Sequence, residues 1–122
     1  MPPRDWALRI SDILDAIARI QRYTSDISFD DFSADEKTVD AVVRNFGIIG
    51  EAARHVPASV RTQHADIPRS TMISMRNIVI HQYVDVSLAT VWTTLEQDLR
   101  PLVPRLRAIQ AEFEQQAGSD QD

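Results

Sequence analysis

The sequence predicts an all-α fold, a compact bundle of four to five helices that forms a single domain. Apolar residues recur along the chain at the i, i+3, i+4 and i+7 spacing of amphipathic helices. Three glycines in 122 residues argue against a turn-rich β fold, and no strand pattern, internal repeat or linker is visible. The last helical stretch is expected to end near Gln116. We therefore expect the domain to cover residues 1–116, with residues 117–122 as a disordered polar tail.

The first helix is expected from about Arg4 to Thr24. Its apolar residues follow the helical spacing: Ile10, Ile13, Leu14, Ile17 and Ile20. The segment that follows, "SDISFDDF" at residues 25–32, is expected to be a break with room for one short turn.

A second helix is expected to reach about His55. Ser33 is the predicted N-cap, and Glu36 stands at the capping-box position three residues later. Gly47 and Gly50 lie inside this helix, and each costs about 1 kcal/mol of helix propensity relative to alanine. We therefore expect close packing against a neighbouring helix at these glycines.

The third helix is expected from Pro68 to about Tyr83, because proline suits the first turn of a helix. Before it, residues 56–68 resemble a connector with a short helix that starts at Pro57.

A fourth helix is expected over residues 87–100, with Asp85 or Ser87 as its N-cap. Pro101 and Pro104 are expected to kink or interrupt it before the last helical stretch.

Composition restricts the classes of function. The formal net charge of −5 speaks against broad, non-specific binding of nucleic acid. The positive side chains are nearly all arginine, with Lys37 as the single lysine, and arginine suits bidentate contacts to phosphate, so a local electropositive cleft is compatible with the total. The absence of cysteine excludes disulfides and thiolate metal sites. No apolar stretch suits a signal peptide or a membrane span, so we expect a cytoplasmic protein.

The stretch "MRNIVIHQY" at residues 75–83 places polar groups on an otherwise apolar helix. Asn77 and His81 share one face, whereas Arg76 falls among the apolar residues near Tyr83. Arg76 and His81 point about 140° apart on an ideal helix. They converge only if the arginine reaches round, the helix loosens or a partner chain closes the site. The alternative is a buried arginine paired with a carboxylate such as Glu51, beside a satisfied histidine.

"RNIVIHQY" resembles the pattern of arginine, four residues, histidine, any residue and tyrosine in HepT-like toxins of the HEPN superfamily. "RDWALRISDILDAIARIQRY" and "TVDAVVRNFGIIGEAA" resemble the first two helices of that family. The likeness continues through "IPRSTMISMRNIVIHQYVDVSLATVWTTLEQDL" and covers about residues 4–106 in order. Arg69 departs from the tryptophan usual after the proline, and the usual Leu-Pro of the last helix reads Leu99-Arg100-Pro101.

The resemblance implies a HEPN-like bundle that dimerises, with both motif helices lining a shared cleft. It further implies a metal-independent endoribonuclease without a cofactor, acting as the toxin of a type VII toxin–antitoxin pair. Its antitoxin would be an MntA-like nucleotidyltransferase that transfers AMP to Tyr83.

The chemistry of the residues suits this expectation. His81 can exchange protons near neutral pH, because an unperturbed imidazole has a pKa near 6.5. Arg76 can brace phosphate oxygens, Asn77 can orient the imidazole or hold a phosphate oxygen, and Tyr83 can contact RNA. Two roles stay open for Glu51. It either supports the site, by pairing with Arg76 or lining the cleft, or is simply solvated on the helix surface.

Two other classes of function stay open. One is a non-catalytic helical partner that binds a nucleotidyltransferase, and the other is a structural dimer with a satisfied core arginine. His55 and His64 are expected to be ordinary surface residues.

Overall fold

The computed structural model describes residues 3–57, 59, 62, 72 and 88–120. Every element of this part of the chain is a helix: α1 (Pro3–Thr24), α2 (Phe29–Ala34), α3 (Glu36–Arg54), α6 (Leu88–Gln97) and α7 (Leu99–Asp120). The all-α prediction is therefore confirmed for the described residues.

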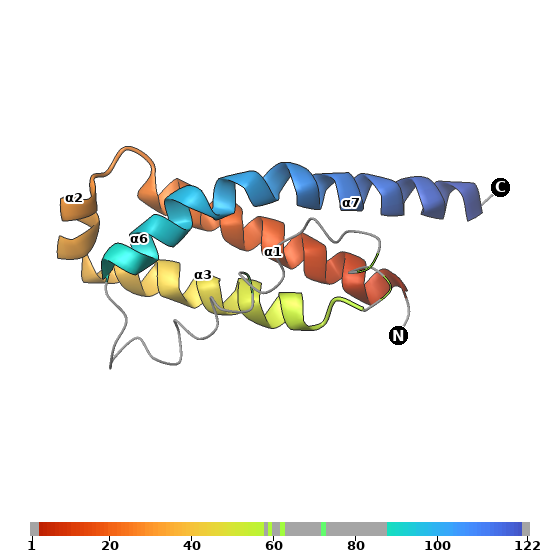
Figure 1. The fold of residues 1–122 in the computed structure, drawn as a ribbon, viewed down its shortest axis with the longest axis horizontal. Helices are drawn as coiled ribbons and strands as arrows, with labels where there is room; N and C mark the ends of the chain where they lie inside the picture. The colour runs from red at the N-terminus through yellow and green to blue at the C-terminus, as the bar shows by residue number, and fades with distance from the viewer. Residues whose placement is uncertain (1–2, 58, 60–61, 63–71, 73–87, 121–122) are drawn as a thin grey trace.

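Helix α1 lies between α3 and α7 and runs antiparallel to both (Figure 1). The short helix α2 sits at the end where the chain passes from α1 to α3, and it contacts both α3 and α6. The last turns of α7 project beyond the N-terminal end of α1 (Figure 1). Fully buried side chains from α1, α2, α3 and α7 share one core: Ile13, Ile17, Ile20, Phe32, Val42, Phe46, Ile49, Leu99, Leu102, Leu106 and Ile109. This bundle fixes where the polar side chains described below lie.

The segment expected as a break contains helix α2. Ser28 caps this helix with a reciprocal capping box: its hydroxyl accepts a hydrogen bond from the Asp31 N–H at 3.1 Å, and the Asp31 carboxylate accepts one from the Ser28 N–H at 3.4 Å. Phe32 is fully buried, so core packing holds a helix that is too short to be stable alone. The short turn considered for residues 25–32 is thus a helix of six residues that runs on to Ala34.

Helix α3 begins at Glu36, and its N-cap is Asp35, two residues after the predicted N-cap Ser33. The Asp35 carboxylate accepts hydrogen bonds from the Thr38 hydroxyl at 2.7 Å and the Thr38 N–H at 3.3 Å. These hydrogen bonds from Thr38 lower the pKa of the Asp35 carboxyl below its usual value. Ser33 belongs to α2, where its hydroxyl donates to the Phe29 carbonyl at 2.9 Å. The cap prediction was wrong because α2 occupies the position of Ser33.

The interruption between α6 and α7 comes at Asp98, ahead of both prolines. Pro101 lies in the first turn of α7, where a missing N–H removes no helical hydrogen bond. Pro104 lies inside α7, which continues past it. The predicted interruption at these prolines was therefore wrong, and the alternative of a kink stays a prediction.

Helix α7 ends at Asp120, so residues 117–120, expected as tail, are helical. No proline follows Pro104, and Gly118 costs only about 1 kcal/mol relative to alanine, so nothing in this stretch stops the helix strongly.

Several predictions lie wholly or mostly outside the described residues, namely the connector, the third helix and the caps at Asp85 or Ser87. Within that stretch Ser59, Thr62 and Met72 are helical. The predicted boundaries there stay predictions. Gly50 is buried, which agrees with the close packing expected at this glycine.

Candidate functional site

Four of the predicted site residues, Arg76, Asn77, His81 and Tyr83, lie outside the described residues. The nearest described position is Met72, which is helical and 2% exposed and belongs to the hydrophobic core. The chain is thus anchored in the core one helical turn before Arg76 in the sequence. The roles predicted for the four residues stay predictions.

Glu51, the fifth predicted site residue, lies on the surface in the last turn of α3. Its side chain is 48% exposed, and its two oxygens lie 3.2 Å from Arg54 Nη1 and 3.3 Å from His55 Nε2. Such i, i+3 and i, i+4 contacts between exposed groups stabilise a helix only slightly. The structure therefore brings Glu51 together with two neighbours on its own helix, and a supporting role for it stays a prediction. His55 is 40% exposed, which confirms its predicted surface position, and His64 lies outside the described residues.

A polar pair that sequence reasoning missed connects α1 to α3. Asn45 is only 4% exposed, and it is the buried polar side chain among the described residues. Its amide donates to the Ala41 carbonyl at 2.8 Å and accepts a hydrogen bond from Arg19 Nη1 at 3.4 Å. The available signal was an asparagine at a core position of the helical pattern, beside Val42, Phe46 and Ile49. A buried amide needs such partners.

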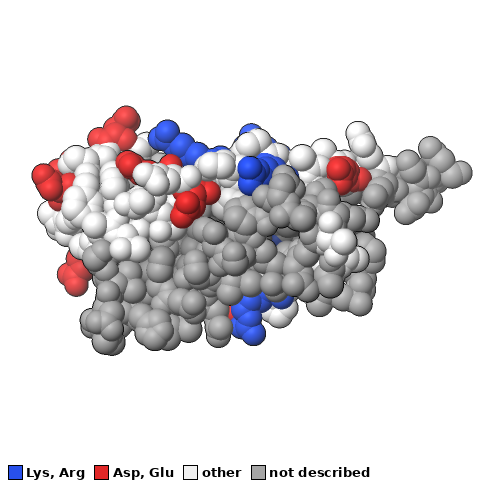
Figure 2. All heavy atoms as spheres, in the orientation of Figure 1, with Lys and Arg blue, Asp and Glu red and all other residues white. Residues whose placement is uncertain are grey.

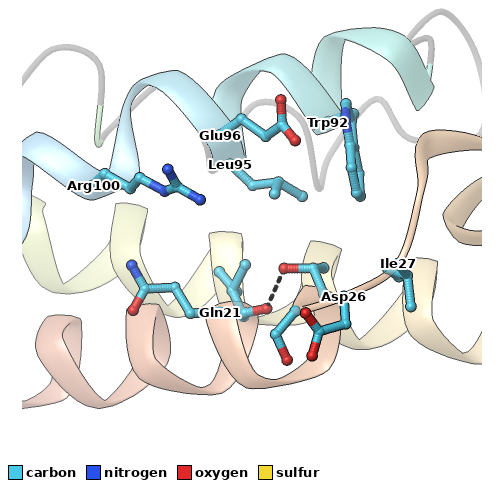
Figure 3. Close-up of a pocket in the computed structure, with 10 residues that line it drawn as sticks. Gln21, Asp26, Ile27, Trp92, Leu95, Glu96 and Arg100 are labelled. Carbon is cyan, nitrogen blue, oxygen red and sulfur yellow. Dashed lines mark hydrogen bonds between the residues drawn. The ribbon is translucent and has the colours of Figure 1, made fainter.

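A pocket of about 340 Å³ opens between the C-terminal end of α1 and the α6–α7 junction (Figure 3). We call it the Trp92 pocket, and it is lined by Ile20, Gln21, Thr24, Ser25, Asp26, Ile27, Trp92, Leu95, Glu96 and Arg100. Glu96 and Arg100 come from the α6–α7 side, whereas Gln21 and Asp26 come from the α1 side, so polar groups line two facing walls. The Thr24 hydroxyl is already used, because it donates to the Ile20 carbonyl at 2.8 Å. No pattern in the sequence indicates this pocket.

A second hollow of about 260 Å³ lies farther along the same side of α1, where Ser11, Asp15 and Gln21 face Arg107 and Gln110 of α7. It shares Gln21 with the Trp92 pocket.

Charged side chains are unevenly distributed on the visible face. Figure 2 shows red acidic groups gathered mostly at the α2 end, while blue basic groups lie nearer the middle of the molecule. Acidic residues that are exposed in α2 and at the start of α3 are Asp30, Asp31, Asp35 and Glu36.

In the described ranges, no group of three or more His, Cys, Asp or Glu side chains is arranged to hold a metal ion. Each helix that the structure describes is too short or too polar to cross a bilayer.

The family model described as "Ribonuclease HepT-like" matches residues 13–109. A protein named "Probable ribonuclease HepT" from Thermococcus cleftensis is 39% identical over 93 residues, which cover 76% of this chain and 84% of that protein. The chain belongs to the HepT-like ribonuclease family. This membership confirms the resemblance carried by the motif, and the matched range includes both Glu51 and the stretch 75–83.

Other relatives of this HepT-like chain carry related names. A "Putative RNase" of Methanocaldococcus jannaschii is 30% identical over 115 residues, which cover 94% of this chain and 99% of that protein. A longer protein of the same organism, named "Gamma-glutamylcyclotransferase and putative RNase", is 32% identical over 111 residues that make up 50% of its length. No solved structure gives a significant match. The fold and the ribonuclease family are thus established together, and the details of the chemistry belong to the proposal below.

Proposed function

We propose that this chain is an endoribonuclease that cleaves RNA without a metal ion, at a site carried by residues 75–83. One observation carries the proposal. The family match spans residues 13–109 without leaving out the motif, and Arg76 and His81 stand in it at the spacing of the family pattern. Relatives matched over most of their length are named as ribonucleases.

The reaction follows from the chemistry of RNA. The 2′-hydroxyl oxygen attacks the adjacent phosphorus, the bond from phosphorus to the 5′-oxygen breaks, and the products are a 2′,3′-cyclic phosphate and a 5′-hydroxyl. His81 moves the proton, taking it from the 2′-hydroxyl or giving it to the leaving oxygen. Arg76 stabilises the charge that develops on the phosphate oxygens, and Asn77 orients the imidazole or holds one of those oxygens.

The proposed active form is a homodimer. Arg76 and His81 point about 140° apart on an ideal helix, so one helix alone does not easily present both to one phosphate. A cleft between two copies removes this difficulty, because the motif helices of both subunits can line it. Tyr83 and Glu51 are proposed to support RNA binding in this cleft.

The proposed biological role is that of a toxin held in check by a nucleotidyltransferase. The antitoxin would transfer AMP from ATP to the Tyr83 hydroxyl: a bond forms between that oxygen and the α-phosphorus, and pyrophosphate leaves. The attached nucleotide would fill the cleft, and its phosphate would repel the RNA backbone. We expect adenylylated protein to lose RNA cleavage, and equal cleavage by both forms would contradict this regulation.

The test is RNA cleavage by the purified protein in the presence of a metal chelator. We expect the wild type to cut RNA but not an all-deoxy strand, and His81→Ala or Arg76→Ala to be slower by about 100-fold or more. His64→Ala and Arg44→Ala are matched controls that should cleave normally. Wild-type protein without activity, together with growth that expression does not arrest, would favour the non-catalytic partner of a nucleotidyltransferase instead.

A further inference from the structure

The Trp92 pocket combines an aromatic wall with charges of both signs. The Trp92 ring packs against Phe32, with ring centroids 5.1 Å apart, and against Phe29 at 6.0 Å. It is thereby held in place while it also lines the pocket (Figure 3). A ring fixed by such packing is a platform for a flat ligand, because little rotamer entropy is lost when the ligand stacks.

The charged groups of the pocket are not paired with one another. Glu96 and Arg100 are four residues apart, yet within the described part of the chain no hydrogen bond or ion pair joins the side chain of Glu96, Arg100 or Asp26 to another residue. Carboxylates are acceptors only, and a guanidinium is a donor only. The pocket therefore offers two acceptor groups and one separate anion site.

We propose that the Trp92 pocket binds a guanine nucleotide, and that in RNA it selects a guanine base. Guanine presents two neighbouring donors, N1–H and the N2 amino group, which match the two oxygens of one carboxylate. Adenine, cytosine and uracil each present a single donor group on that edge, beside acceptors that a carboxylate repels. Glu96 receives the base edge, Trp92 stacks on the ring and Arg100 receives the phosphate.

The remaining polar groups suit the sugar. Asp26 and Gln21 line the α1 wall, facing Glu96 and Arg100 (Figure 3). The ribose hydroxyls are donors that the Asp26 carboxylate and the Gln21 amide oxygen can accept. A volume of about 340 Å³ lies at the lower end of the range for small-molecule sites, which suits one nucleotide. The selection of guanine in RNA rests on the proposed ribonuclease function, whereas binding of the free nucleotide does not.

The experiment is calorimetric titration of the full chain with GMP, AMP, CMP, UMP and guanosine. We expect GMP to bind about 10-fold more tightly than the other three nucleotides, since a good bidentate base contact discriminates by about 1–3 kcal/mol. Glu96→Gln should abolish this preference, and Arg100→Ala should weaken all four nucleotides but not guanosine. In a Trp6→Phe background, fluorescence quenching on binding should report Trp92, because the chain has two tryptophans.

Matched controls are Glu114→Gln and Arg44→Ala, which change exposed residues outside the pocket and should leave the affinities unchanged. Equal affinity for the four nucleotides, no saturable binding, or a guanine preference that survives Glu96→Gln would each overturn the proposal. His81→Ala should lose RNA cleavage but keep its guanine preference, so the two proposals can be tested separately. Wild-type protein that binds guanine but cuts no RNA would support the pocket and contradict the ribonuclease. Wild-type protein that cuts RNA but shows no guanine preference would contradict the pocket and support the ribonuclease.

Discussion

Helix α1 borders two different environments on its two sides. Toward α3, the polar group Asn45 is buried and bonded to Arg19 of α1 and to a carbonyl of its own helix. Toward α6 and α7, Gln21 of α1 faces Arg100 across an open pocket, and neither side chain is bonded to another residue within the described part of the chain.

The difference follows from how closely the helices approach. Where side chains of two helices interdigitate, water is excluded and a polar group must find its partner inside the protein. Where a gap is left, polar groups stay hydrated, and a ligand can replace that water. Polar residues on the α3 side should therefore matter for stability, and those on the α7 side for binding.

The largest expected effect concerns the packed side. Phe46 of α3 is fully buried, so Phe46→Ala should lower the free energy of unfolding by about 3–5 kcal/mol through lost burial and the remaining cavity. Phe29 is 36% exposed, and Phe29→Ala should cost clearly less. Urea denaturation followed by circular dichroism measures both. Equal losses would show that the α2 end is packed as tightly as the α1–α3 contact.

The two amides give a smaller but more direct comparison. Asn45→Ala should lower the free energy of unfolding by about 1–3 kcal/mol, because Arg19 loses an acceptor in a partly buried position. Gln21→Ala should change it by less than about 0.5 kcal/mol, since the amide is exposed to the pocket. Urea denaturation followed by circular dichroism measures both changes in the free energy of unfolding. A large cost for Gln21→Ala would mean that the pocket wall is structural, which would weaken the proposed nucleotide site.

Much of the fold could be predicted, because the apolar periodicity of a long helix is visible within its own segment of the sequence. The span expected for the first helix differs from α1 by one residue at its start, and the end expected near His55 lies one residue beyond α3. The full length of helix α2 was not predicted, because its stability comes from burial of Phe32, a tertiary effect that six residues do not reveal. Its presence then moved the cap of α3 from Ser33 to Asp35.

The same distinction between local and tertiary signals applies to the candidate functional residues. The motif around Arg76 and His81 could be recognised from the sequence, because its residues are close together in the chain and match a family pattern. The Trp92 pocket was not, because Gln21 and Glu96 meet only through the packing of α1 against the α6–α7 junction. Periodicity states which face of a helix is apolar, but it does not state where two helices leave a gap.

The smallest expected effect on stability concerns Asp35, whose carboxylate accepts its hydrogen bonds at the surface, outside both the core and the pocket. Because hydrogen bonds from Thr38 lower its pKa in the folded state, the native protein favours the carboxylate. This stabilisation is fully present above the unfolded pKa, near 3.9, and is lost as the pH falls through the lower folded value. The thermal midpoint of wild type should therefore lie above that of Asp35→Asn at pH 6, and this difference should be smaller at pH 3.

The cause of this pH dependence can be isolated at Thr38. Thr38→Val removes the hydroxyl that donates at 2.7 Å and should reduce the dependence, whereas Thr38→Ser keeps the donor and should preserve it. Because asparagine also caps helices well, the Asp35→Asn variant retains α3 and changes mainly the charge. If wild type and Asp35→Asn lose stability in parallel between pH 6 and pH 3, the cap does not contribute through its charge, and hydrogen bonding to Thr38 alone accounts for the start of α3.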